Sequence, residues 1–231
     1  TKILSFRYIS ISRMNFVEGY YQTPNYSRPP LDPNLETRQN VINEIIQTEE
    51  TYNQDLSKMN CIVTQPLLHE IEMGKISNIS PQIPTLFQKL SEIKMISDNL
   101  RQELHSYIVG QISIGQVFKT FPKLIIIYFD YMRQYNSIMP RLLAKRKEDK
   151  AFDNFLTVAE NQIQNSIESF LIIPIQRPPR YRLLLKKLLE TYKPPAAFPQ
   201  TPEECDYVLL KNAYDTTCDQ IQKLDERVNE F

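Results

Sequence analysis

Scarcity of glycine is the feature that most restricts how this chain can fold. Among 231 residues the only glycines are Gly19, Gly74, Gly110 and Gly115. A large sheet needs many tight turns, and tight turns depend on Gly, Asn-Gly or Asp-Gly pairs. Long stretches instead repeat apolar residues every three or four positions, which is the period of an α-helix. The chain is therefore predicted to be all-α.

The apolar stripes predict an elongated antiparallel helical bundle of about six main helices. Pro66 is expected to end the first helix, and Pro174, Pro178 and Pro179 are expected to kink or locally unwind one long helix in the fourth region. Forty residues of helix span about 60 Å, more than the diameter of roughly 45 Å of a compact sphere of this chain length. The expected helices cover residues 35–65, 83–108, 117–129, 131–145, 152–192 and a last stretch that runs to 231.

The first of these helices carries one continuous apolar stripe. Glu44 lies about 80° from its centre, on the flank between the buried and the solvated faces. A glutamate in that position can be a solvated side chain or a binding group. The stripe consists of Val41, Ile45, Thr48, Tyr52, Leu56, Met59 and Val63.

The amino-terminal residues 1–37 differ from the rest, because they combine four prolines with several aromatic residues. They are predicted to form an irregular leader, followed by one domain over residues 38–231. The aromatic side chains would be costly to leave in water, so we expect the leader to dock on the bundle. It would either brace the bundle or cover its binding surface.

Charge and composition exclude several functions. Lys and Arg number 27, as do Asp and Glu, so no overall basic field favours nucleic acid. No apolar run approaches the roughly 20 residues of a transmembrane helix. Neither GxxxxGK nor GxGxxG can be written with these glycines, and His69 and His105 form no metal-binding spacing, so no cofactor or metal site is expected. Three scattered cysteines predict a reducing, cytoplasmic setting.

Three strings of the sequence resemble a known family. VINEIIQTEETYNQDL (41–56), IGQVFKTFPKLIIIYFDYMRQYNSIM (114–139) and SFLIIPIQRPPRYRLLLKKLLETY (169–192) are similar to the three conserved regions of the Dbl-homology domain. That domain is the exchange module of guanine nucleotide exchange factors for Rho-family GTPases. The resemblance implies binding to the switch regions of a Rho or Rac GTPase, with release of its nucleotide. It implies no covalent chemistry and therefore no catalytic residue in the covalent sense.

The resemblance also implies which residues bind the GTPase. Glu44 matches the glutamate that contacts switch I, and Gln176 and Arg180 match the contacts to switch II. Lys187 shares a helical face with Arg180 and is a weaker candidate. An asparagine of the last helix falls on Asn229 if VNE is the motif, whereas LDE would place Asp225 there.

Two further readings stay open at this point. The chain could be a Dbl-like scaffold that has lost exchange activity, since Pro178 replaces the aliphatic residue usual in the third region. A hydrolase or transferase is the weaker reading, because no nucleophile, base and orienting group recur at a readable spacing. Because the chain stops at Phe231 within the expected last helix, we expect a longer protein, with a following pleckstrin-homology domain and peripheral recruitment to membranes.

Overall fold

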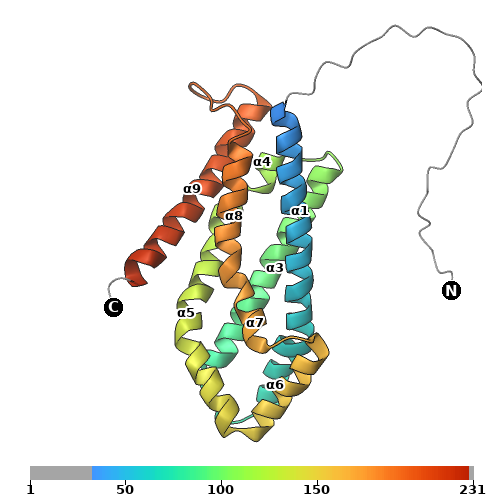
Figure 1. Ribbon diagram of the computed structural model, residues 1–231, viewed down its shortest axis with the longest axis vertical. Coiled ribbons are helices and arrows are strands. Elements are labelled where there is room, and N and C mark those ends of the chain that lie inside the picture. Colours follow the sequence, from blue (N-terminus) through green and yellow to red (C-terminus); the bar gives the residue numbers. More distant parts are fainter. Residues whose placement is uncertain (1–32, 229–231) are drawn as a thin grey trace, which may run out of the picture. The chain divides into compact units, whose positions relative to one another are not determined.

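The computed structural model describes residues 33–228, and within them every regular element is a helix (Figure 1). Six helices have 14 or more residues, which confirms the predicted all-α bundle. The elements are α1 (Pro33–Met59), the π-helical turn η1 (Asn60–Thr64), α2 (Gln65–Glu72), α3 (Gln82–Ile108), α4 (Ile114–Val117), α5 (Phe121–Glu148), α6 (Lys150–Ile163), α7 (Ile167–Leu171), α8 (Ile173–Leu189) and α9 (Pro202–Val228).

The long helices lie lengthwise beside one another and alternate in direction. In Figure 1, α1, α5 and α9 run one way, and α3 and α8 run the other. Helix α8 packs against α1, α5 and α9, while α3 packs against α1 and α5. The segments 41–56 and 169–192, far apart in the sequence, are thus brought side by side.

The predicted stripes form the core of this bundle. In α3 the residues of the apolar stripe from Ile83 to Leu104 are buried, and Leu56 of the α1 stripe is 3% exposed. Aromatic rings join α5 to α8: the Tyr181 ring meets those of Phe121 and Tyr128 edge-on, at 4.9 and 6.2 Å between centroids. Such edge-to-face pairs stabilise beyond their buried area.

Three predicted helix boundaries are wrong. Pro66 does not end the first helix, because it lies in the first turn of α2, where its missing N–H is tolerated, and η1 joins that turn to α1. Residues 117–145 do not form two successive helices: α5 is continuous from Phe121, since both Phe129 and Tyr131 are buried and no glycine or proline separates them. Helix α1 begins at Pro33, so residues 33–37 are helical rather than irregular.

The region 152–192 is not one kinked helix. It breaks at Gln164, whose φ of 56° is left-handed, and Ser166 then caps α7 by accepting a hydrogen bond from the Ser169 N–H. Pro178 and Pro179, where the kink was expected, both lie inside α8.

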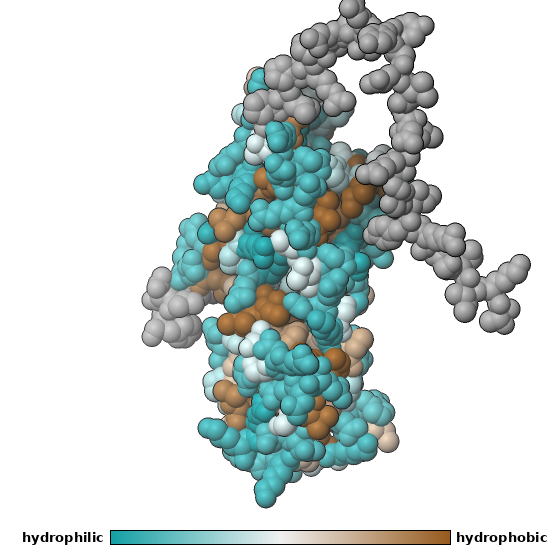
Figure 2. Space-filling model, turned by 45° about the vertical axis from the view of Figure 1, so that its right-hand side comes forward, coloured by the Kyte–Doolittle hydropathy of each residue, from teal (hydrophilic) through white to brown (hydrophobic). Residues whose placement is uncertain are grey.

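The surface of this bundle is mostly polar. Figure 2 shows one face on which hydrophilic side chains predominate and apolar patches are small and separate. None of the helices described between residues 33 and 228 is long and apolar enough to cross a membrane. The predicted docking of the leader concerns residues outside the described part of the chain.

Candidate functional site

A groove of about 550 Å³ runs between α1 and α8. Most of its lining residues have polar side chains, and they come from the two segments with the most specific motifs. The groove is lined by Glu44, Gln47, Thr48, Thr51, Tyr52 and Asp55 of α1 and by Ile173, Gln176, Arg177 and Arg180 of α8. We call it the α1–α8 groove.

Glu44 lies on the α1 wall of this groove. Its side chain is 43% exposed and its carboxylate is ion-paired with the Lys187 ammonium of α8 at 3.5 Å. An exposed pair of this kind stabilises by less than about 1 kcal/mol and is readily exchanged for another partner. The Glu44 carboxylate is therefore reachable by hydrogen-bond donors of a second protein.

Gln176 and Arg180 lie one turn apart on α8, and both are exposed. Pro178 between them is buried, and the helix continues through it. The spacing of four therefore places both side chains on the same wall of the groove. An amide and a guanidinium in this arrangement can bind backbone carbonyls or a carboxylate.

The third predicted contact is not brought into the groove by the part of the chain that is described. Asp225 is exposed near the end of α9 and is not among the groove residues. Asn229 lies outside the described residues. The choice between these two positions stays open.

A buried charge pair underlies the groove, and the sequence reading missed it. Glu49 of α1 is fully buried and pairs with the guanidinium of Arg177, which is 4% exposed. The Glu49 carboxylate also accepts hydrogen bonds from the Tyr181 hydroxyl at 2.7 Å and the Ser97 hydroxyl at 2.6 Å. One carboxylate thus joins α1, α3 and α8.

The surroundings keep the Arg177 guanidinium charged. Arg177 lies over the rings of Tyr181 and Tyr52, at 4.5 and 4.9 Å from their centroids. Desolvation lowers the pKa of Arg177, but Tyr181 and Glu49 outweigh it and hold that pKa above its ordinary value. Burial raises the pKa of Tyr181 well above its usual value, so the phenol stays a neutral donor.

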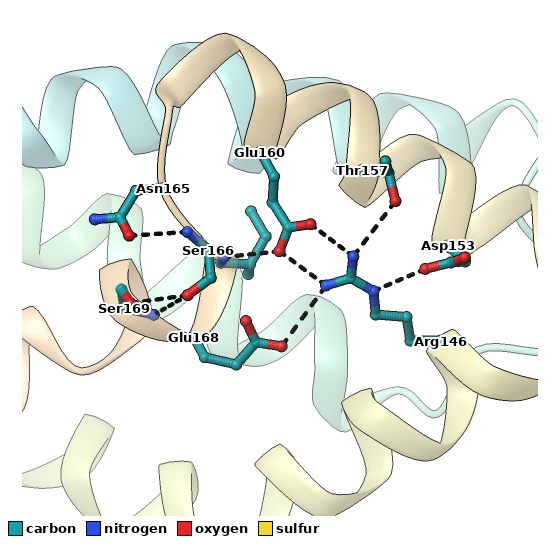
Figure 3. Close-up of polar contacts among 9 residues, drawn as sticks. Arg146, Asp153, Thr157, Glu160, Asn165, Ser166, Glu168 and Ser169 are labelled. Atoms are coloured by element: carbon teal, nitrogen blue, oxygen red, sulfur yellow. Dashed lines mark hydrogen bonds and ion pairs between the residues drawn. The ribbon is translucent and has the colours of Figure 1, made fainter.

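Two basic residues near the end of α5, Lys145 and Arg146, form ion pairs within the bundle. Arg146 donates to Asp153 at 2.8 Å and to Glu160 at 2.6 Å, and Glu168 lies 3.7 Å away (Figure 3). These partners come from α6 and α7, so Arg146 joins three helices at the break before α7. Lys145 pairs with Asp149 and donates to the Ser77 carbonyl.

This cluster predicts an acid-dependent loss of stability. The hydrogen bond from Arg146 holds the pKa of Glu160 below its ordinary 4.5. A carboxylate whose pKa is lowered in the folded state contributes stability at pH values above its unfolded-state pKa, and that contribution is lost as the pH falls through its folded-state pKa.

Arg146→Met should lower the free energy of unfolding by about 1–2 kcal/mol at pH 7. Urea titrations at pH 7 and about pH 3 should show a smaller acid-induced loss in the variant, and an equal loss in both proteins would contradict the assignment.

Among residues 33–228 no group of three His, Cys, Asp or Glu side chains is arranged to hold a metal ion. Cys61, Cys205 and Cys218 are free thiols.

Known proteins are similar to this chain over most of its length. The RhoGEF domain model matches residues 41–225. The chain is 27% identical over 205 residues to Rac guanine nucleotide exchange factor JJ of Dictyostelium discoideum, covering 87% of this chain and 16% of that protein. It is 27% identical over 202 residues to human guanine nucleotide exchange factor VAV3, covering 85% of this chain and 22% of that protein. The chain thus spans only a small part of the curated relatives it matches.

Solved structures share the fold. A chain in the crystal structure of human RhoA in complex with the DH/PH fragment of PDZRHOGEF superposes with a TM-score of 0.68 at 17% identity, covering 85% of this chain and 55% of that one. A chain of the Vav1 exchange factor gives 0.65 at 23% identity, covering 85% and 51%. At these identities the likeness concerns the arrangement of helices.

Proposed function

Because this chain belongs to the RhoGEF domain family, we propose that it is a guanine nucleotide exchange factor that binds the switch regions of a Rho or Rac small GTPase. The observation that carries the proposal is the α1–α8 groove, which collects Glu44, Gln176 and Arg180 on one accessible surface. One relative named above is called a Rac guanine nucleotide exchange factor, and the other is called a guanine nucleotide exchange factor. GDP would leave and GTP would replace it.

The mechanism we infer is differential binding. A surface that binds the nucleotide-free GTPase more tightly than the loaded one must weaken nucleotide binding by the same factor. The Glu44 carboxylate would accept hydrogen bonds from hydroxyl and amide groups of switch I. Gln176 and Arg180 would engage switch II from the opposite wall. No bond to the protein is made or broken, and the chain needs no cofactor for this activity.

The setting follows from the same proposal. Free thiols at all three cysteines suit a cytoplasmic protein. The chain is a small part of its relatives' length, so we place recruitment to membranes in a pleckstrin-homology domain outside it. A GTPase at the membrane would then be the partner of the α1–α8 groove.

Release of fluorescent GDP from a panel of Rho-family GTPases tests the proposal. Each GTPase is preloaded, excess GTP is added, and release is followed with and without this chain. We expect at least one GTPase to release GDP at least tenfold faster. A GTPase that binds the chain without faster release would favour the scaffold reading, and failure to bind any member would contradict the proposed function.

A further inference from the structure

The turn of α8 that carries Gln176 lacks two of the backbone hydrogen bonds of an ordinary helix. Proline has no N–H, so Pro178 and Pro179 cannot donate to the carbonyls of Pro174 and Ile175, which are four residues earlier. The backbone of this turn is thus held less firmly than the same turn of an ordinary helix. Contacts made by its side chains must locate it.

Arg177 provides such a contact from the middle of the turn. Its guanidinium pairs with the buried Glu49 carboxylate and lies over the rings of Tyr52 and Tyr181. The Arg177 Nε has no hydrogen-bond partner, so the side chain is held through its terminal nitrogen and its stacking. Arg177 directly follows Gln176 and precedes Arg180 by three positions, so fixing its side chain fixes the backbone from which both of theirs extend.

Glu49 in turn is fixed from α3. The Asn53 amide donates to the Ser97 hydroxyl at 3.2 Å and to Asp98 at 2.8 Å, and the Ser97 hydroxyl donates to Glu49. The Arg101 guanidinium donates to the side-chain amide oxygen of Asn53 at 3.0 Å. The carboxylate that receives Arg177 is therefore part of a hydrogen-bonded chain that ties α1 to α3.

We propose that Glu49 and Arg177 are positioning residues, which set the place of Gln176 and Arg180 on α8 relative to Glu44 on α1. This inference rests on the proposed exchange function. Neither residue is exposed enough to bind a GTPase itself. Pro178 and Pro179 remove backbone hydrogen bonds from the turn of α8 that carries Gln176. The buried charge pair replaces that restraint.

The test is a double variant, Glu49→Gln with Arg177→Met, which removes both charges and keeps an acceptor oxygen for Tyr181. Replacing both members of a buried pair leaves no uncompensated charge, so the fold should survive. We expect a melting temperature within about 5 °C of wild type and GDP release slower by at least tenfold. Hydrogen exchange of the amides of residues 175–182 should become at least tenfold faster, whereas amides of α9 should be unchanged.

Two further variants make the result decisive. Tyr181→Phe removes one hydrogen bond to Glu49 without a change of shape, and it should give a smaller change of the same sign even if the double variant fails to fold. Arg146→Met with Glu160→Gln removes a remote pair and should leave GDP release by folded protein unchanged.

Hydrogen exchange needs no GTPase, so it separates this inference from the proposed function. If the wild-type chain accelerates GDP release from no GTPase, the proposed function fails. Faster amide exchange in α8 of the double variant than of wild type would still show that the pair holds the turn. Unchanged protection of residues 175–182 would overturn the inference. Faster amide exchange with undiminished GDP release would overturn it as well, because the pair would then hold α8 without positioning the site.

Discussion

GDP release stimulated by the Glu44→Ala variant is expected to be at least tenfold slower than with wild type, a loss of about 1.4 kcal/mol in transition-state stabilisation. Alanine removes the carboxylate that we propose for switch I, from a side chain that is 43% exposed. The same loss is expected for Arg180→Ala on the opposite wall. Stability should change by less than about 1 kcal/mol, because the pair of Glu44 with Lys187 is exposed.

Glu50 offers a matched control for this prediction. Its side chain is 45% exposed, it lies on the same helix, and it pairs with Arg101 on the α3 side, away from the groove. Glu50→Ala should therefore leave GDP release within about twofold of wild type, as expected for a surface substitution outside the binding site. Equal rates of GDP release with Glu44→Ala and Glu50→Ala would show that the assignment of Glu44 to the interface is wrong. A loss of activity in Glu44→Ala that came only from unfolding would show the same.

The largest loss of stability is expected for Glu49→Gln. The change is nearly isosteric, but it leaves the guanidinium of Arg177 buried at 4% exposure without its counter-charge. Breaking one side of a buried pair costs about 3–5 kcal/mol, which is a large fraction of the stability of an ordinary domain. Urea unfolding at pH 7 measures this loss directly.

The comparison that matters is between this variant and the double one. Adding Arg177→Met to Glu49→Gln should restore most of the lost stability, because no uncompensated charge is then buried. A single Glu49→Gln variant that lost less than about 1 kcal/mol would mean that the pair is not buried as described.

The helices could be predicted because their apolar stripes are long and regular. Several of their ends could not be predicted. Positions from Ile83 to Leu104 follow the helical period without interruption, and α3 begins and ends within one residue of the prediction. The break at Gln164 has no such signal, because the left-handed residue that ends a helix is usually glycine or asparagine rather than glutamine. Pro66 was misread because a proline in the first turn of a helix is tolerated and need not end the helical path.

The groove residues could be predicted from sequence motifs. The buried Glu49–Arg177 pair beneath them could not, because it depends on how α1 and α8 pack. A signal for it was nevertheless present. Glu49 lies four positions after Ile45 and three before Tyr52, which is the spacing of the α1 stripe. Arg177 lies three positions after Pro174 and four before Tyr181 on α8. Opposite charges on two facing apolar stripes indicate a buried ion pair, but only the structure shows which stripes face each other.

The affinity of this chain for one responsive GTPase, measured nucleotide-free and again loaded with GDP and Mg²⁺, tests the central claim most directly. Linkage requires that the ratio of the two affinities equal the factor by which the chain weakens GDP binding. We predict that the wild-type chain binds the nucleotide-free GTPase at least tenfold more tightly and that Glu44→Ala loses most of this difference. Equal affinity of the wild-type chain for the two forms would contradict exchange by differential binding at the α1–α8 groove.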